Sequence, residues 1–453
     1  MKSKKICVFG AGISGLVQAL FNQEKGHSVC ILDEGEKVGG VLKSKQENGY
    51  LLDFGANTFS LRKKEIQDFL TRYDVLDHAW DANLFANKRF IVRNGKLVSL
   101  PQSFFSFFTS SFLSPLGKLR LLAEPFIPRR EEKTLEESVG CFIKRRFGQD
   151  VLSYAANPFI GGIYAAKPET LSVKHAFPSV YEKERKYGSV FRGFFKERKN
   201  ATQNSIKTRL ISFKNGMSEM PERLSQSLNQ SPSLRTSIKE VRRLPNEKWN
   251  VISEKANGNQ INGIFDEIFC TLPSHQLNNI NWINLNDQEL LEDLTRVVHP
   301  PLSLVYLGYK RKQIRHPLDG FGFLVPEVEK FEILGTLFSS TLFPNRAPKD
   351  KILLTSFVGG ERNPELCDLS EKKIIELTIR ENNKFLGIDG PPDFTKVIHW
   401  KESIPLPDLT MNCRLKAAKG LEKNNRGLFF GGSYISGPPL PNCIIPAYRS
   451  PFD

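Results

Sequence analysis

The chain has 453 residues, enough for three domains at about 150 residues each. Hydrophobic residues make up 40% of it and charged residues 25%, a composition that is typical of folded proteins and excludes a disordered chain. Lys and Arg number 64 against 49 Asp and Glu, and the net charge of +15 favours an anionic ligand or partner.

The cysteine and histidine spacings exclude two further classes of protein. The seven cysteines are odd in number and contain no CxxC pair, so we expect no disulfide scaffold. The seven histidines show no HxH or HxxxH spacing, so we expect no metal site. Without a leader pattern or an apolar run of about 20 residues, we expect a cytoplasmic protein that has no spanning helix. Nucleic acid is a poor candidate partner because the basic residues are dispersed.

The N-terminal segment carries the most specific local pattern. An apolar run, Ile6–Phe9, precedes Gly10-Ala-Gly12-Ile-Ser-Gly15, a stretch of helical spacing follows, and a second apolar run ends at Asp33. This strand–GxGxxG–helix–strand–acid order predicts a dinucleotide site, in which the glycines let a pyrophosphate approach the helix N-terminus and the acid accepts ribose hydroxyls. The alternative is a glycine-rich turn in an unrelated α/β protein. The predicted cofactor contacts here are Gly10, Gly12, Ile13, Ser14, Gly15, Asp33 and Glu34.

The residues after the acid distinguish between two dinucleotides. Glu36-Lys37-Val38-Gly39-Gly40 resembles an extension found in the flavin-containing amine oxidase superfamily, although Lys37 stands where an Arg is usual. The resemblance implies that Gly39 and Gly40 lie against the pyrophosphate. It also implies that a loop runs beside the flavin ring, formed by Gly55, Ala56, Asn57 and Thr58. We therefore expect FAD rather than NAD, bound non-covalently with one molecule per chain.

Later segments, spread over nearly the whole chain, resemble the protoporphyrinogen oxidase family. They are NPFIGGIYAAKP at 157–168, PLDGFGFLVP at 317–326, FPNRAP at 343–348, FVGG at 357–360 and GLFFGGSY at 427–434. The resemblance implies that Leu324, Leu337 and Phe357 clamp the rings of a flat apolar substrate, and that the Gly162 carbonyl faces its pyrrole N–H groups. From the residues alone, three strand-core side chains and a turn glycine would be the simpler interpretation.

The same resemblance implies further contacts and one departure. Val241 corresponds to a strand at the adenine edge, and the closing flavin motif contains Gly432, Ser433 and Ile444. Asp77 stands where we place the family's propionate-pairing Arg. We expect that this propionate points to solvent, the alternative being a cation near Lys88 and Arg89 that pairs with it.

Residues 101–117 contain no charge and seven large apolar side chains, and basic residues follow at Lys118, Arg120, Arg129 and Arg130. The run is too short to span a bilayer. It fits either a segment that dips into an anionic leaflet or a helical subdomain that packs this face on itself. In the family, the corresponding region lies beside the substrate entrance and contacts the membrane.

We therefore expect an α/β plus α+β fold with interleaved domains. The expected FAD domain comprises 1–75, 206–275 and 397–453, the substrate domain 76–98 and 276–396 around a mixed sheet, and the helical domain 99–205.

The expected activity is the oxidation of protoporphyrinogen IX to protoporphyrin IX by FAD and molecular oxygen in haem biosynthesis, with no catalytic residue beyond the flavin. The alternatives are coproporphyrinogen III oxidation, a general amine or carotenoid oxidoreductase, and a non-enzymatic flavin-binding relative. Expected partners are the inner face of an anionic cell membrane and a ferrochelatase.

Overall fold

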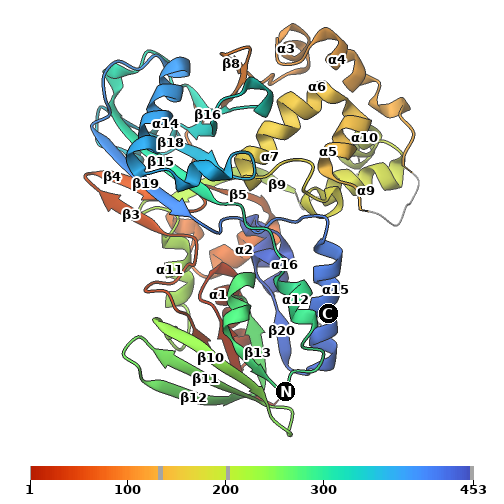
Figure 1. The fold of residues 1–453 in the computed structure, drawn as a ribbon, viewed down its shortest axis with the longest axis vertical. Coiled ribbons are helices and arrows are strands. Elements are labelled where there is room, and N and C mark those ends of the chain that lie inside the picture. The colour runs from red at the N-terminus through yellow and green to blue at the C-terminus, as the bar shows by residue number, and fades with distance from the viewer. Residues whose placement is uncertain (1, 131–135, 200–204, 449–453) are drawn as a thin grey trace.

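The computed structural model describes residues 2–130, 136–199 and 205–448 (Figure 1). Four parallel strands form the sheet that contains the N-terminal segment, in the order β2-β1-β13-β20. They are β1 (Lys5–Phe9), β2 (Ser28–Leu32), β13 (Glu267–Cys270) and β20 (Leu428–Phe430). Helix α1 (Ile13–Glu24) connects β1 to β2 and packs against α17 (Leu440–Tyr448). Strand β1 is an apolar run because protein covers both faces of this parallel sheet.

A second sheet packs on one side of the first. Its order is β12-β11-β10-β14, and its strands are β10 (Thr236–Arg243), β11 (Trp249–Lys255), β12 (Gln260–Phe265) and β14 (Asn281–Ile283). Side chains from both sheets share one core with α12 (Leu290–Thr295) and α15 (Met411–Asn424). On the other side, α11 (Glu219–Gln226) and α2 (Lys64–Arg72) contribute to the core around α1.

The largest sheet has seven strands in the order β19-β15-β18-β17-β16-β7-β8. They are β7 (Lys88–Arg93), β8 (Lys96–Ser99), β15 (Leu302–Lys310), β16 (Gly320–Leu324), β17 (Ile333–Leu337), β18 (Lys351–Gly359) and β19 (Phe394–Trp400). Only β16 and β7 pair in parallel, so the sheet is mixed. Helix α14 (Glu371–Leu386) covers one face, and the short α13 (Ser339–Leu342) follows β17.

Helices occupy the upper right of Figure 1. They are α3 (Phe104–Thr109), α4 (Pro115–Leu122), α5 (Val139–Phe147), α6 (Gln149–Val151), α7 (Asn157–Tyr164), α8 (Val173–Ala176), α9 (Pro178–Tyr187) and α10 (Val190–Lys199). Helix α7 contacts β16 and β17 and so lies beside the seven-stranded sheet. In the part of the chain that the structure describes, no helix is long and apolar enough to cross a membrane.

Two small sheets connect these regions. One is the hairpin of β3 (Ser44–Glu47) and β4 (Tyr50–Asp53), and the other joins β5 (Phe59–Lys63), β9 (Ser205–Phe213) and β6 (Ala79–Asp81).

The expected fold class, α/β plus α+β, is confirmed, and the domain division stays a prediction whose edges do not follow the packing. The edge at 397 cuts β19, and the edge at 76 separates β6 from its partner β9. The edge at 276 separates Leu277, Trp282 and Leu294 from the core that they share with the parallel sheet.

Candidate functional site

Many of the predicted cofactor residues meet at one edge of the parallel sheet. The glycine motif follows β1, Asp33 and Glu34 follow β2, and Gly432 and Ser433 follow β20. Strand β13 lies between β1 and β20, and Thr271 follows it at the same edge. Ligands of open parallel sheets bind at this carboxyl edge, because loops and helix N-termini converge there.

The glycines at this edge form a cradle beside the N-terminus of α1. Gly12 pairs with Gly39 in an isolated bridge, and the Gly39 N–H donates to the Ala11 carbonyl over 2.8 Å. A Cβ on Gly12 would meet no atom within 4 Å, so the space above it is open. No side chain caps α1, and its first turn has no acidic residue. The free N–H groups and the positive dipole end can therefore receive an anion such as a pyrophosphate.

Two of the predicted residues here are structural. Gly15 packs α1 onto the glycine turn, because its Cβ would lie 1.9 Å from the Gly10 carbonyl oxygen. The side chain of Ile13 is buried in the core around α1, so only its backbone N–H is placed toward the cradle.

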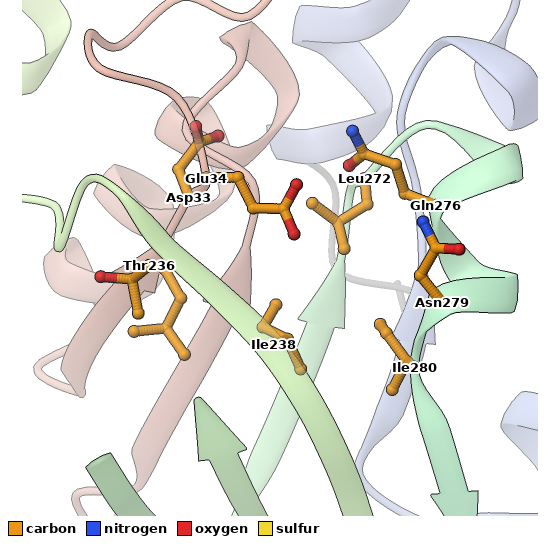
Figure 2. Close-up of a pocket in the computed structure, with 9 residues that line it drawn as sticks. Asp33, Glu34, Thr236, Ile238, Leu272, Gln276, Asn279 and Ile280 are labelled. Atoms are coloured by element: carbon orange, nitrogen blue, oxygen red, sulfur yellow. The ribbon is translucent and has the colours of Figure 1, made fainter. Parts of the chain in front are cut away.

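A pocket lies beside Asp33 (Figure 2). Its lining combines four apolar residues with five polar ones: Leu32, Ile238, Leu272 and Ile280, and Asp33, Glu34, Thr236, Gln276 and Asn279. The Asp33 carboxylate accepts N–H groups of Ala11 and Gly35, each over 2.6 Å. Two of its four acceptor positions remain for other donors. A flat base between the apolar side chains, with its ribose hydroxyls on Asp33, would fit this composition.

Val241 was expected at this pocket and does not line it. Its side chain is fully buried in the core between the two sheets. Ile238, three residues earlier on β10, lines the pocket instead. Gln276, Asn279 and Ile280 are additional lining residues that the sequence patterns did not indicate.

The loop of residues 55–58 borders the same cradle. A Cβ on Gly55 would lie 2.2 Å from the Val41 carbonyl oxygen, so this loop packs directly against the residue after the Gly39–Gly40 turn. Ala56, Asn57 and Thr58 are half-buried. In the closing segment, Ser433 is half-buried at the start of α16 (Ser433–Ser436), whereas the Ile444 side chain is buried in the core around α1. Any ligand contact of Ile444 would therefore come from its backbone.

The structure places Leu324, Leu337 and Phe357 on one face of the seven-stranded sheet. Leu324 pairs with Gly335, which pairs with Phe357, and Leu337 lies two residues after Gly335 on the same face. This is the face opposite α14, and we call it the clamp face. All three side chains are half-exposed, although most of their neighbours on these strands are buried. Phe357 also packs at the edge of a core that contains Leu304 and Tyr306. A Cβ on Gly335 would lie 3.1 Å from a methyl group of Leu324, so the Leu324 side chain rests against this glycine.

Helix α7 closes one side of the clamp face through Gly162. A Cβ on Gly162 would lie 2.5 Å from a methyl group of Leu324, so α7 and β16 are in close contact here. Gly162 lies in the last turn of α7, where backbone carbonyls have no intrahelical donor. Phe159 and Ile163, on the same side of α7, are exposed apolar side chains.

The expectation that a propionate near Asp77 points to solvent stays a prediction. Asp77 lies in a single turn, η1 (Leu76–His78), which packs through Leu76 on the core around α1 rather than on the clamp face. Arg89 lies two residues before Ile91, which pairs with Leu324, so Arg89 is on the clamp face. Its guanidinium lies 5.4 Å from the ring centre of Phe321. Arg89 is therefore an exposed cation on the clamp face.

Comparisons with known proteins show the family of this chain. The sequence profile of flavin containing amine oxidoreductases matches residues 13–444. Protoporphyrinogen oxidase 2 of Arabidopsis thaliana is 32% identical, over 98% of this chain and 92% of the relative. Coproporphyrinogen III oxidase of Staphylococcus aureus is 27% identical, over 98% of this chain and 97% of the relative. A crystal structure from Exiguobacterium sp. 255-15 has a TM-score of 0.80 at 20% identity and covers 99% of this chain and 98% of its own.

The profile match covers nearly the whole chain, from the first residue of α1 onward, and includes the Gly39–Gly40 turn and the clamp face. The matching profile describes flavin-dependent redox enzymes, so the protein is an oxidoreductase with a flavin cofactor. The chain belongs to the family of flavin containing amine oxidoreductases.

Proposed function

We propose that this protein oxidises protoporphyrinogen IX to protoporphyrin IX with one non-covalently bound FAD per chain and molecular oxygen as the acceptor. Six hydrogen atoms leave the substrate, and three molecules of oxygen become three of hydrogen peroxide. The plant relative, which matches over nearly its whole length, carries the name of this activity. The observation that carries the proposal is the row of half-exposed apolar side chains on the clamp face.

The residues present fit FAD. The open space above Gly12 and the uncapped N-terminus of α1 would hold the pyrophosphate, and the pocket beside Asp33 would hold the adenosine. When bound, FAD supplies two-electron transfer from the ring and reaction with oxygen, chemistry that side chains lack. Denaturation should release all the FAD, and flavin that stays on the precipitated chain would show a covalent link.

The clamp residues bind and orient the substrate. A tetrapyrrole buries a large apolar area, so Leu324, Leu337 and Phe357 would bind it by contact and exclude water from the reacting face. The Gly162 carbonyl would accept pyrrole N–H groups and fix the ring in its plane. Arg89 would pair with one propionate at the open edge.

We expect that Phe357→Ala and Leu324→Ala each weaken substrate binding about tenfold to hundredfold while flavin stays bound. Each change removes about 1–3 kcal/mol of apolar contact with the ring. Steady-state fluorescence of porphyrin formation measures KM, and absorbance measures bound flavin. Ile352→Ala is the matched control, because Ile352 lies on the same strand and packs into the core on the α14 side. Unchanged KM values in both clamp variants would reject the clamp.

Coproporphyrinogen III is the second candidate substrate, because the Staphylococcus aureus relative carries that name and also matches over nearly its whole length. It has four propionates, and the clamp face offers Arg89 as an exposed cation. Assays of the purified protein with both porphyrinogens decide between them through kcat/KM. Oxidation of neither would reject the proposed function.

We further propose that the protein works as a cytoplasmic enzyme at the inner face of an anionic membrane. Exposed apolar side chains cluster on α3, α4, η2 (Glu124–Phe126) and α10, which contact one another in turn. This membrane patch comprises Phe105, Phe108, Leu116, Leu119, Leu122, Phe126, Phe194 and Phe195. Leu116 is 78% exposed and Phe195 is 70% exposed, whereas Phe112 and Leu113 of the same expected segment are buried.

Two of the four basic residues expected at lipid headgroups are engaged within the protein, whereas Arg129 is exposed. Lys118 donates to the carbonyls of Phe108 and Ser110, and Arg120 donates to those of Arg145 and Arg146. Both side chains are thus occupied within the protein. Arg192 and Lys196 on α10 are exposed beside the apolar patch and are the better candidates. Transfer of product to a ferrochelatase stays a prediction.

Phe105→Ser/Leu116→Ser is expected to reduce sedimentation with phosphatidylglycerol vesicles severalfold without changing the thermal unfolding temperature, because both side chains are exposed. Wild-type binding should fall in high salt, which screens the basic residues. Ile264→Ser is the control, since this apolar residue is also exposed and its strand, β12, lies at the opposite end of the molecule from α3 and α4 (Figure 1). Equal loss in patch and control variants would contradict the membrane proposal.

A further inference from the structure

Arg362 lies in the loop that follows β18, five residues after the clamp residue Phe357. Its Nη1 donates to the Val325 carbonyl over 2.8 Å, and its Nη2 donates to the Asn157 side-chain oxygen over 3.1 Å. Val325 directly follows Leu324, and Asn157 is the first residue of α7, which carries Gly162. One guanidinium thus bridges the three segments that carry the clamp.

Neighbouring contacts make this link rigid. The Asn157 oxygen also accepts the Glu327 N–H over 2.9 Å, so α7 and the chain after β16 meet at one atom. At the other end of α7, the Glu361 N–H donates to the Ala165 carbonyl over 2.8 Å, and the Glu361 carboxylate accepts the Lys167 N–H over 2.8 Å. The loop after β18 therefore holds α7 at both of its ends.

The surroundings of Arg362 show why this link needs an arginine side chain. Among the described residues, no carboxylate oxygen lies within 4.0 Å of the guanidinium. Burial lowers the pKa of Arg362 to about 10, so it remains a cation at neutral pH. The acceptors on both sides are neutral and lie in different segments. A planar fork of donors can reach both at once, whereas the point charge of a lysine reaches one.

We infer that Arg362 is a positioning residue that fixes the separation of Leu324, Gly162 and Phe357 and thereby the orientation of the substrate ring. The inference rests on the proposed function, since it assumes that the clamp holds a tetrapyrrole. Arg362 need not touch the substrate, because its two acceptors are a backbone carbonyl and a side-chain amide of the protein.

Arg362→Gln is expected to lower kcat about tenfold or more, since a displacement of about 1 Å at the reacting centre can cost up to about a hundredfold. KM should change less than about threefold, because the apolar area of the clamp remains. Arg362→Lys should keep the charge and one acceptor and recover only part of kcat. Arg311→Gln is the matched control, because Arg311 is also half-buried and donates to two carbonyls, those of Ile314 and His316, away from the clamp.

Hydrogen–deuterium exchange gives a readout that does not depend on activity. We expect faster exchange of the Glu327, Glu361 and Lys167 amides in Arg362→Gln and no change there in Arg311→Gln. Wild-type kcat in Arg362→Gln, or in Arg362→Lys if the first variant does not fold, would overturn the inference. A raised KM with unchanged kcat would also overturn it. If the wild type oxidises neither porphyrinogen, the proposed function fails, and unchanged exchange at these amides would then reject the positioning link separately.

Discussion

Gly12→Val is expected to abolish flavin binding while the apoprotein stays folded. Gly12 has φ −72°, which any L-residue adopts, and its Cβ would meet no atom of the described chain within 4 Å. The valine side chain would instead enter the open space at the N-terminus of α1, where the pyrophosphate would bind. Added FAD should raise the unfolding temperature of the wild-type apoprotein by mass action, and it should leave that of Gly12→Val unchanged.

Gly15→Ala is the contrasting variant. Its Cβ would lie 1.9 Å from the Gly10 carbonyl oxygen, and backbone cannot move aside as a side chain can. We expect the apoprotein itself to lose about 1–3 kcal/mol of unfolding free energy through this overpacking. Flavin retained by Gly12→Val would show that the pyrophosphate lies elsewhere, even if Gly15→Ala behaves as expected.

The glycine cradle could be predicted from the sequence because its function depends on local backbone geometry. A turn after a buried strand, an open approach at Gly12 and a helix that starts one residue later all follow from residue order. Contacts between segments that are distant in the sequence could not be predicted in this way. Leu272 and Gln276 reach the pocket only because β13 inserts beside β1, a pairing across some 260 residues that no local pattern encodes.

The absence of Val241 from the pocket lining has a physical origin in β10. A register shift between Ile238 and Glu240 interrupts the alternation of this strand. Ile238 and Val241 are therefore both buried, although they are three residues apart. A pattern of strict alternation cannot show which inward residue lies at the pocket end of the strand.

The clamp and the basic residues show a second limit. Apolar residues on strands predict burial, and only the packing shows that the side chains of Leu324, Leu337 and Phe357 stay half-exposed on the side opposite α14. Packing likewise decides which groups a long basic side chain contacts. Lys118 follows an apolar run in the sequence, but in the structure it caps the carbonyls at the end of α3.

Glu124→Gln is expected to destabilise the protein by about 3 kcal/mol at neutral pH. Glu124 and Arg146 form an ion pair, and both side chains are 0% exposed. Removing one partner leaves the other charge buried, although Glu184 at 3.5 Å still offers Arg146 part of a counter-charge. Glu124 also accepts the Val190 and Phe191 N–H groups at the start of α10, so the change should loosen the helix that carries part of the membrane patch.

The effect should depend on pH in a defined direction. Burial alone would raise the pKa of Glu124, but donors from Ser189, the α10 backbone and Arg146 outweigh it and lower the pKa. A lowered folded-state pKa gives stabilisation that is complete above the unfolded value of about 4.3 and is lost as pH falls through the folded value. In urea unfolding, the difference in unfolding free energy between wild type and Glu124→Gln should thus be constant above about pH 5 and shrink below about pH 4. Glu292→Gln is the control, because its 2.7 Å pair with Arg296 is exposed and should contribute less than about 0.5 kcal/mol. A free-energy difference that grows as the pH falls would show that the ion pair does not stabilise the helical region. A loss of unfolding free energy no larger than that of Glu292→Gln would show the same.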